Sequence, residues 1–162
     1  MRINNTEYSR IRQLDEDVWL VQRDGRLYTV VHTENIDTHK DRLDALVKAG
    51  INTTGIIEID EGRGLIVREH IAGVSAYELV KGAGIKPVLL LQLYDMSEKA
   101  ENAGYNLDYF PSNFVADDQD RLYYVGDGFS PYMEEWSLES WGIRYWDRTP
   151  EFEMYLQEYG QS

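Results

Sequence analysis

Residues 106–115 read NLDYFPSNFV, and a second apolar run, LYYV, follows at 122–125. The first run carries Asp108 and, five residues later, Asn113, while Asp127 stands just past the second run. The two runs predict a short β-hairpin joined by an acidic turn. An Asp can position or deprotonate a hydroxyl group, and carboxylate and amide oxygens are the ligands that Mg2+ prefers. The alternative is a hairpin capped by polar turns, in which Asp108 and Asn113 bond only local backbone.

This spacing resembles the catalytic loop of the protein-kinase-like superfamily. It is most similar to the aminoglycoside and choline kinase branch, where an H-G-D-x-x-x-x-N loop precedes a short hairpin and a metal-binding Asp. The resemblance implies that Asp108 is the catalytic residue and that Asn113 and Asp127 are metal ligands. It also implies that ATP and Mg2+ are the cofactors.

Composition limits the classes of partner. The chain has 162 residues and a net charge of −13, with 29 acids against 16 bases. Such an acidic chain repels nucleic-acid phosphates, so we expect no nucleic-acid partner. There is no cysteine, which excludes disulfides and thiol nucleophiles, and no apolar run approaches the roughly 18 residues of a membrane span. These features predict a cytoplasmic protein without a membrane partner.

The length is compatible with one domain or two small lobes. A complete kinase-like catalytic unit is usually much longer, so the resemblance is to a reduced, divergent member of the superfamily. The predicted fold class is α+β: a kinase-like two-lobed fold whose N-lobe is an antiparallel sheet with one helix and whose C-lobe is short and mainly helical.

Residues 1–72 form the predicted N-lobe. β-prone apolar runs and a helix-period segment at 39–49 give the order β-β-β-α-β-β, and Asp24-Gly25 is a strong hairpin signal. The same element order is found in kinase-like N-lobes. The predicted strands are 8–14, 18–21, 27–31, 53–59 and 65–71.

The end of this lobe resembles the hinge of small-molecule kinases. Residues 68–73 read REHIAG, similar to the e-y-i-x-G pattern of that hinge. The resemblance implies that Glu69, His70 and Ile71 bind the adenine of a nucleotide through backbone groups.

Residues 73–162 form the predicted, truncated C-lobe. It begins with a short hinge helix capped by Ser75, followed by a helix at 87–103 that is apolar nearly all round and therefore expected to be buried, Leu91 included. The catalytic-like loop and hairpin occupy 106–129.

Aromatic C-terminal helices complete the chain. We expect Trp136, Trp141 and Trp146 to pack the underside of the lobe. The alternative is that this region forms an aromatic groove for a protein partner.

The sequence departs from the kinase pattern at four places. The predicted third strand, 27–32, has no Lys for nucleotide phosphates, and 13–18 is acidic where a Gly-rich loop is usual. Asn106 replaces the loop His. Gly126 stands where the metal-binding Asp is expected, so Asp127 comes one residue late.

Two functions therefore remain open. The first is a compact ATP- and Mg2+-dependent phosphotransferase that uses Asp108 with Asn113 and Asp127, in which Arg63, Arg68 or Arg144 could replace the missing Lys. The second is a catalytically weak or inactive pseudokinase-type scaffold that binds a protein partner.

Overall fold

The computed structural model describes residues 1–126 and 128–159. The chain divides into two compact units. The first contains Met1–Asp44 and Thr54–Ile71, and the second joins Ala45–Thr53 to the chain from Ala72 onward. Residues 45–53 thus group with the second unit, although the sequence-based division placed them in the N-lobe.

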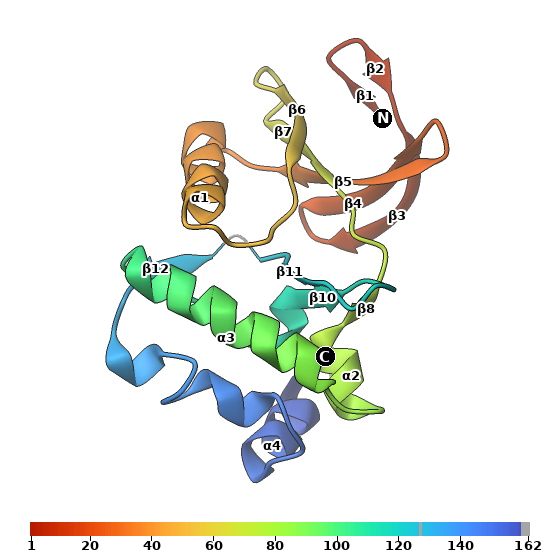
Figure 1. The fold of residues 1–162 in the computed structure, drawn as a ribbon. Helices are drawn as coiled ribbons and strands as arrows, with labels where there is room; N and C mark the ends of the chain where they lie inside the picture. The colour runs from red at the N-terminus through yellow and green to blue at the C-terminus, as the bar shows by residue number, and fades with distance from the viewer. Residues whose placement is uncertain (127, 160–162) are drawn as a thin grey trace. The chain divides into compact units, whose positions relative to one another are not determined.

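A five-stranded antiparallel sheet dominates the first unit (Figure 1). Its strand order is β3-β4-β5-β7-β6, and helix α1 (Ile36–Lys48) connects β5 to β6 along the chain. This is the predicted β-β-β-α-β-β order. The strands are β3 (Ser9–Asp15), β4 (Val18–Arg23), β5 (Arg26–His32), β6 (Ile56–Asp60) and β7 (Leu65–Glu69).

The turn between β4 and β5 shows how local sequence sets the register of this sheet. Asp24 and Gly25 have φ angles of 51° and 76°, and Arg23 pairs with Arg26 across them. Two successive positive φ angles define a two-residue hairpin turn of the kind that Asp-Gly favours. The predicted hairpin is confirmed.

The core of the first unit lies on one face of the sheet. Val21, Val30 and Val67 are fully buried there and pack with Ile3 and Tyr8. Ile3 belongs to a small N-terminal hairpin, β1 (Arg2–Ile3) with β2 (Thr6–Glu7), which the sequence did not predict. Strands of two residues are too short to carry an alternating pattern.

The second unit is built around α3 (Pro87–Asn102). One face of this helix is buried, including Leu93, which is 0% exposed. The prediction of a buried helix holds for this face but is wrong for Leu91, which is 71% exposed, and Val88 is also 44% exposed. The helix therefore buries one apolar face and leaves other apolar side chains exposed.

Three short strands, β8 (Val74–Ser75), β10 (Phe114–Ala116) and β11 (Leu122–Tyr124), form a sheet beside α3 in the order β11-β10-β8. Ser75 accepts a hydrogen bond from the Glu78 N–H at 3.2 Å and caps α2 (Ala76–Lys81), as predicted. Just before β8, a Cβ on Gly73 would lie 2.2 Å from the Ala116 carbonyl oxygen. Only Gly permits this close approach of the two backbones.

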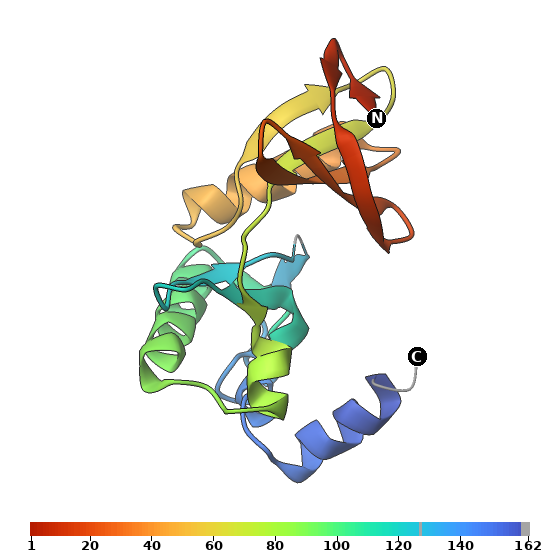
Figure 2. The same ribbon diagram turned by 90° about the vertical axis from the view of Figure 1, so that its right-hand side faces the viewer.

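The C-terminal part combines 3-10 turns with one α-helix (Figure 2). In α4 (Pro150–Tyr159), Phe152 is fully buried against Tyr77 and Val80 of α2. None of the described helices is long and apolar enough to cross a membrane. The remaining elements are β9 (Tyr105–Leu107), η1 (Pro111–Asn113), β12 (Phe129–Pro131), η2 (Glu134–Trp136), η3 (Gly142–Tyr145) and α4 (Pro150–Tyr159).

Candidate functional site

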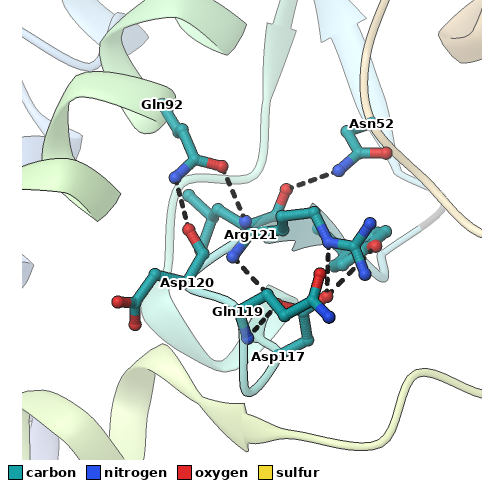
Figure 3. A network of polar contacts seen from close by, with 8 residues as sticks. Asn52, Gln92, Asp117, Gln119, Asp120 and Arg121 are labelled. Atoms are coloured by element: carbon teal, nitrogen blue, oxygen red, sulfur yellow. Dashed lines mark hydrogen bonds and ion pairs between the residues drawn. The ribbon is translucent and has the colours of Figure 1, made fainter.

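The hairpin β10–β11 is held in place by Gln92 of α3 (Figure 3). The Gln92 Nε2 donates to the Asp120 carbonyl oxygen at 2.7 Å, and its Oε1 accepts from the Leu122 N–H at 2.8 Å. Asn52 donates to the Leu122 carbonyl oxygen at 2.9 Å. These contacts satisfy backbone groups of the hairpin that no neighbouring strand reaches, so they position its two strands.

The acidic turn of the hairpin is an ordered structure. Both Asp117 carboxylate oxygens are used: Oδ1 accepts from the N–H groups of Gln119 and Arg121, and Oδ2 from the Arg121 side chain at 2.8 Å. The Arg121 N–H, followed by its guanidinium, lowers the pKa of Asp117. The turn therefore keeps this carboxylate charged and occupied, and Asp117 is a structural residue.

Tyr124, which is fully buried, connects the two halves of the predicted site. Its hydroxyl accepts from the Asp108 N–H at 3.2 Å and donates to the Gly128 carbonyl oxygen at 2.6 Å. The Val125 N–H also donates to the Asn113 carbonyl oxygen at 2.8 Å. The loop containing Asp108 and the segment after β11 are thereby held side by side.

Asp108 and Asn113 interact through the backbone of the loop. The Asn113 Nδ2 donates to the Asp108 carbonyl oxygen at 3.3 Å, and the Asp108 Oδ1 accepts from the Phe110 N–H at 3.3 Å. Within the described residues both side chains thus bond only local backbone, as the alternative of polar turn contacts expected. Both distances are longer than usual for such bonds. The Asp108 side chain is exposed, and within residues 1–126 and 128–159 no partner is found for its Oδ2.

The donors at this loop suit part of a Mg2+ site. Of the two predicted metal ligands, Asn113 supplies an amide oxygen, whereas Asp127 lies outside the described residues. A Cβ on Gly126 would approach the Asn113 Oδ1 to 3.1 Å, so Gly at this position leaves that oxygen uncovered. Mg2+ uses one or two carboxylates together with phosphate oxygens and water. Among the described residues, no group of three or more His, Cys, Asp or Glu side chains is placed to hold a metal ion.

A shallow, largely open cavity of about 410 Å3 lies beside Asp108. Its aromatic wall consists of Phe110, Phe129, Trp136 and Trp141. Trp136 is 49% exposed, and its ring lies edge-on to that of Trp141 at 5.6 Å. The sequence favoured packing for both tryptophans and left an aromatic groove as the alternative, and the aromatic density of 129–146 was the signal for this wall.

Trp146, in contrast, packs as expected. It is buried, and its Nε1 donates to the Tyr109 carbonyl oxygen at 2.8 Å. A Cβ on Gly142 would lie 2.5 Å from the Tyr109 Cβ, so the aromatic segment and the Asp108 loop are in direct contact. This contact places the aromatic wall next to Asp108.

The predicted hinge residues lie in the first unit. Glu69 ends β7, and its N–H donates to the Gly55 carbonyl oxygen at 3.0 Å, so this N–H is already used. The half-buried His70 places its Nδ1 3.4 Å from the Thr29 hydroxyl, and burial, with a smaller contribution from Arg12, lowers its pKa. Ile71 is partly buried.

The first unit lacks positive charge at the two places where the kinase pattern has its phosphate contacts. Strand β5 has no Lys, and the β3–β4 turn contains carboxylates, including Asp17, which lies 3.6 Å from the His32 ring. Arg63 binds the Arg2 carbonyl oxygen, and Arg144 binds the Ser140 carbonyl oxygen at 2.9 Å. Neither arginine, nor Arg68, is among the residues that line the cavity beside Asp108.

An antiparallel sheet with one helix, followed by a mainly helical unit that carries a D-x-x-x-x-N loop and a hairpin, is a protein-kinase-like fold. Among solved structures, the crystal structure of the choline kinase LicA from Streptococcus pneumoniae is similar to this chain, with a TM-score of 0.54 and 15% sequence identity. The match covers 95% of this chain and 74% of that one. At this identity the likeness is one of fold, and the predicted fold class is confirmed. No family model and no curated protein sequence matches the chain.

We expect Tyr124→Phe to destabilise the protein by about 1–3 kcal/mol, because the Gly128 carbonyl and the Asp108 N–H lose their buried partner. Urea unfolding midpoints would measure this. Tyr123→Phe is the matched control: its hydroxyl contact, to Asp117, is long at 3.4 Å, so a smaller loss is expected. Equal losses in the two variants would contradict the bridging role of Tyr124.

Proposed function

We propose that this chain is a kinase-like phosphotransferase in which Asp108 acts on the hydroxyl group of a small acceptor. The observation that carries this proposal is the exposed Asp108 carboxylate at a cavity of about 410 Å3, large enough for a small molecule. A general base needs access to the proton that it removes. The unpartnered Oδ2 of Asp108 in the described part of the chain meets that requirement.

The walls of the cavity favour an acceptor that carries a positive charge. Phe110, Phe129, Trp136 and Trp141 present aromatic rings, which attract cations through their negative faces. Asp108 adds a carboxylate at the same cavity. Because a structurally similar protein is described as a choline kinase, choline is the first acceptor to test.

In this proposal Asp108 orients the acceptor hydroxyl and takes its proton as the hydroxyl oxygen bonds to the γ-phosphorus of ATP, while the bond between that phosphorus and the β–γ bridging oxygen breaks and ADP leaves. Phosphoryl transfer depends mainly on positioning and on neutralising charge, so a rigid loop matters. The Tyr124 hydroxyl holds the Asp108 N–H, and the Asn113 amide holds the Asp108 carbonyl oxygen. Asn113 and Asp127 would hold Mg2+, which when bound neutralises the phosphate charge of ATP. The Glu69 carbonyl oxygen and the backbone groups of His70 and Ile71 would provide the adenine contacts, since the Glu69 N–H is already bonded to Gly55.

A thermal-shift experiment with ATP and Mg2+ tests the nucleotide part of this proposal. Saturation to 100 times the dissociation constant stabilises the folded state by about 2.7 kcal/mol. For a chain of this size, that is a rise in melting temperature of roughly 5–10 °C. We expect the rise to depend on Mg2+ and to be smaller for Asn113→Ala, each variant being compared with its own unliganded form.

The matched control is Asn102→Ala, an exposed amide at the end of α3, which should leave the rise unchanged. Absence of any rise with ATP, with or without Mg2+, would contradict nucleotide binding.

The second candidate is a pseudokinase-type scaffold that binds a protein partner. The observation that favours it is the lack of positive charge where nucleotide phosphates are expected: no Lys on β5 and an acidic β3–β4 turn. Carboxylates there would repel phosphates. This candidate predicts no stabilisation by ATP, so the same thermal-shift experiment separates the two functions.

A further inference from the structure

Phe110 borders two cavities of the second unit. It belongs to the aromatic wall of the cavity beside Asp108. It also lines an open cavity of about 340 Å3, together with Tyr145 and with Tyr155 of α4. A side chain that borders two open spaces has room to change its χ1 rotamer unless neighbouring side chains prevent it. The contacts on the Phe110 ring therefore decide whether the aromatic wall keeps one shape.

Three aromatic rings contact the ring of Phe110. Trp141 meets it edge-on, with 5.0 Å between centroids and 82° between planes. Tyr145 is tilted against it by 57° at 4.9 Å. Tyr155 is stacked on it at 4.9 Å and 17°, so the Tyr155 ring covers a face of Phe110. Aromatic pairs attract one another at such distances, and removing Tyr155 would leave that face against the open cavity that both residues line.

Tyr155 is itself held by packing. Its ring contacts that of Phe152 at 6.2 Å, and Phe152 is fully buried. The Tyr155 hydroxyl lies 3.3 Å from the hydroxyl of Ser112, two residues after Phe110. Tyr155 therefore connects the buried core of α4 to the loop that carries Asp108.

We propose that Tyr155 is a positioning residue, which holds the Phe110 ring in the rotamer that completes the aromatic wall for the acceptor. This inference rests on the proposed function for the nature of the acceptor, whereas the constraint on the ring does not depend on phosphoryl transfer. Tyr155 is not among the described residues that line the cavity beside Asp108, so it acts through Phe110. Loss of the Tyr155 ring should weaken acceptor binding and leave ATP binding unchanged.

Tyr155→Ala is expected to raise the KM of choline about 3–10-fold, while the KM of ATP stays within about twofold of the parent. Leu156→Ala is the matched control, because Leu156 is the next residue of α4 and packs on the same buried cluster. A variant that merely unfolds part of the preparation lowers kcat and not KM, so a loss of stability would not imitate this result.

Tyr155→Phe keeps the ring and loses the hydroxyl. Because the contact of that hydroxyl with Ser112 is long at 3.3 Å, both KM values should stay within about twofold of the parent. A rise of the choline KM in Tyr155→Phe equal to that in Tyr155→Ala would assign the effect to the hydroxyl and overturn the proposed role of the ring.

The Phe110 ring provides a readout that needs no substrate. Three-bond NMR couplings to the Phe110 Cγ report its χ1 angle. We expect one rotamer in the parent, in Leu156→Ala and in Tyr155→Phe, and averaged couplings in Tyr155→Ala. If the Ala variant fails to fold, Tyr155→Leu serves the same comparison, since it removes the ring and keeps most of the apolar volume.

A single Phe110 rotamer without the Tyr155 ring, or equal rises of the choline KM in Tyr155→Ala and Leu156→Ala, would overturn the inference. Absence of phosphate transfer to choline by the parent would contradict the proposed function instead. The couplings would then still decide whether Tyr155 holds Phe110.

Discussion

Asp108→Asn is expected to lower phosphate transfer from ATP to choline by about 10²–10⁴-fold, the usual contribution of a general base. The amide keeps the size of the side chain and can still accept from the Phe110 N–H, but it cannot take up the proton of the acceptor. The free energy of unfolding should change by less than about 1 kcal/mol, because within the described residues the side chain of Asp108 makes this one hydrogen bond and the variant keeps it. Transfer rates and urea midpoints of the same preparations would measure both effects.

Asp118→Asn is the control for this substitution. Asp118 is an exposed carboxylate in the β10–β11 turn, so the variant removes one charge from the same unit without changing the cavity beside Asp108. Transfer should be unaffected. If Asp108→Asn retained normal transfer, or destabilised the protein strongly while Asp118→Asn did not, Asp108 would be a structural turn residue and the proposed role would be wrong.

Leu93→Ala is expected to destabilise the protein by about 2–5 kcal/mol, since it removes a fully buried side chain from the inner face of α3 and leaves a cavity. For a chain of this length each kcal/mol lowers the melting temperature by roughly 2–4 °C. Urea unfolding of the purified variant would give the loss directly.

Leu91→Ala, two residues away on the same helix, makes the same chemical change at an exposed position. Its effect should stay within about 0.5 kcal/mol of the parent. The sequence argument expected a large loss at Leu91. Similar losses at the two positions would show that the outer face of α3 is covered in solution.

The sequence by itself determined the features that depend on neighbouring residues. Asp24-Gly25 predicts its turn because few other residue pairs accept two positive φ angles. Ser75 predicts the start of α2 because its hydroxyl reaches an N–H three residues away. The strand periodicity and the D-x-x-x-x-N spacing likewise sufficed to predict the kinase-like fold and to select Asp108 and Asn113 as candidates.

Only the tertiary structure decided which groups from distant segments meet. Helical periodicity could not distinguish Leu91 from Leu93 in a run apolar nearly all round, because the packing of other segments determines which face is covered. Nothing local marks Tyr124 as the bridge between the Asp108 loop and Gly128, since both bonds depend on how the hairpin packs. The aromatic wall beside Asp108 and the hydrogen bond from the Met133 N–H to the buried Asn106 side chain arise in the same way: burial and hydrogen-bond partners are set by contacts between segments far apart in the chain.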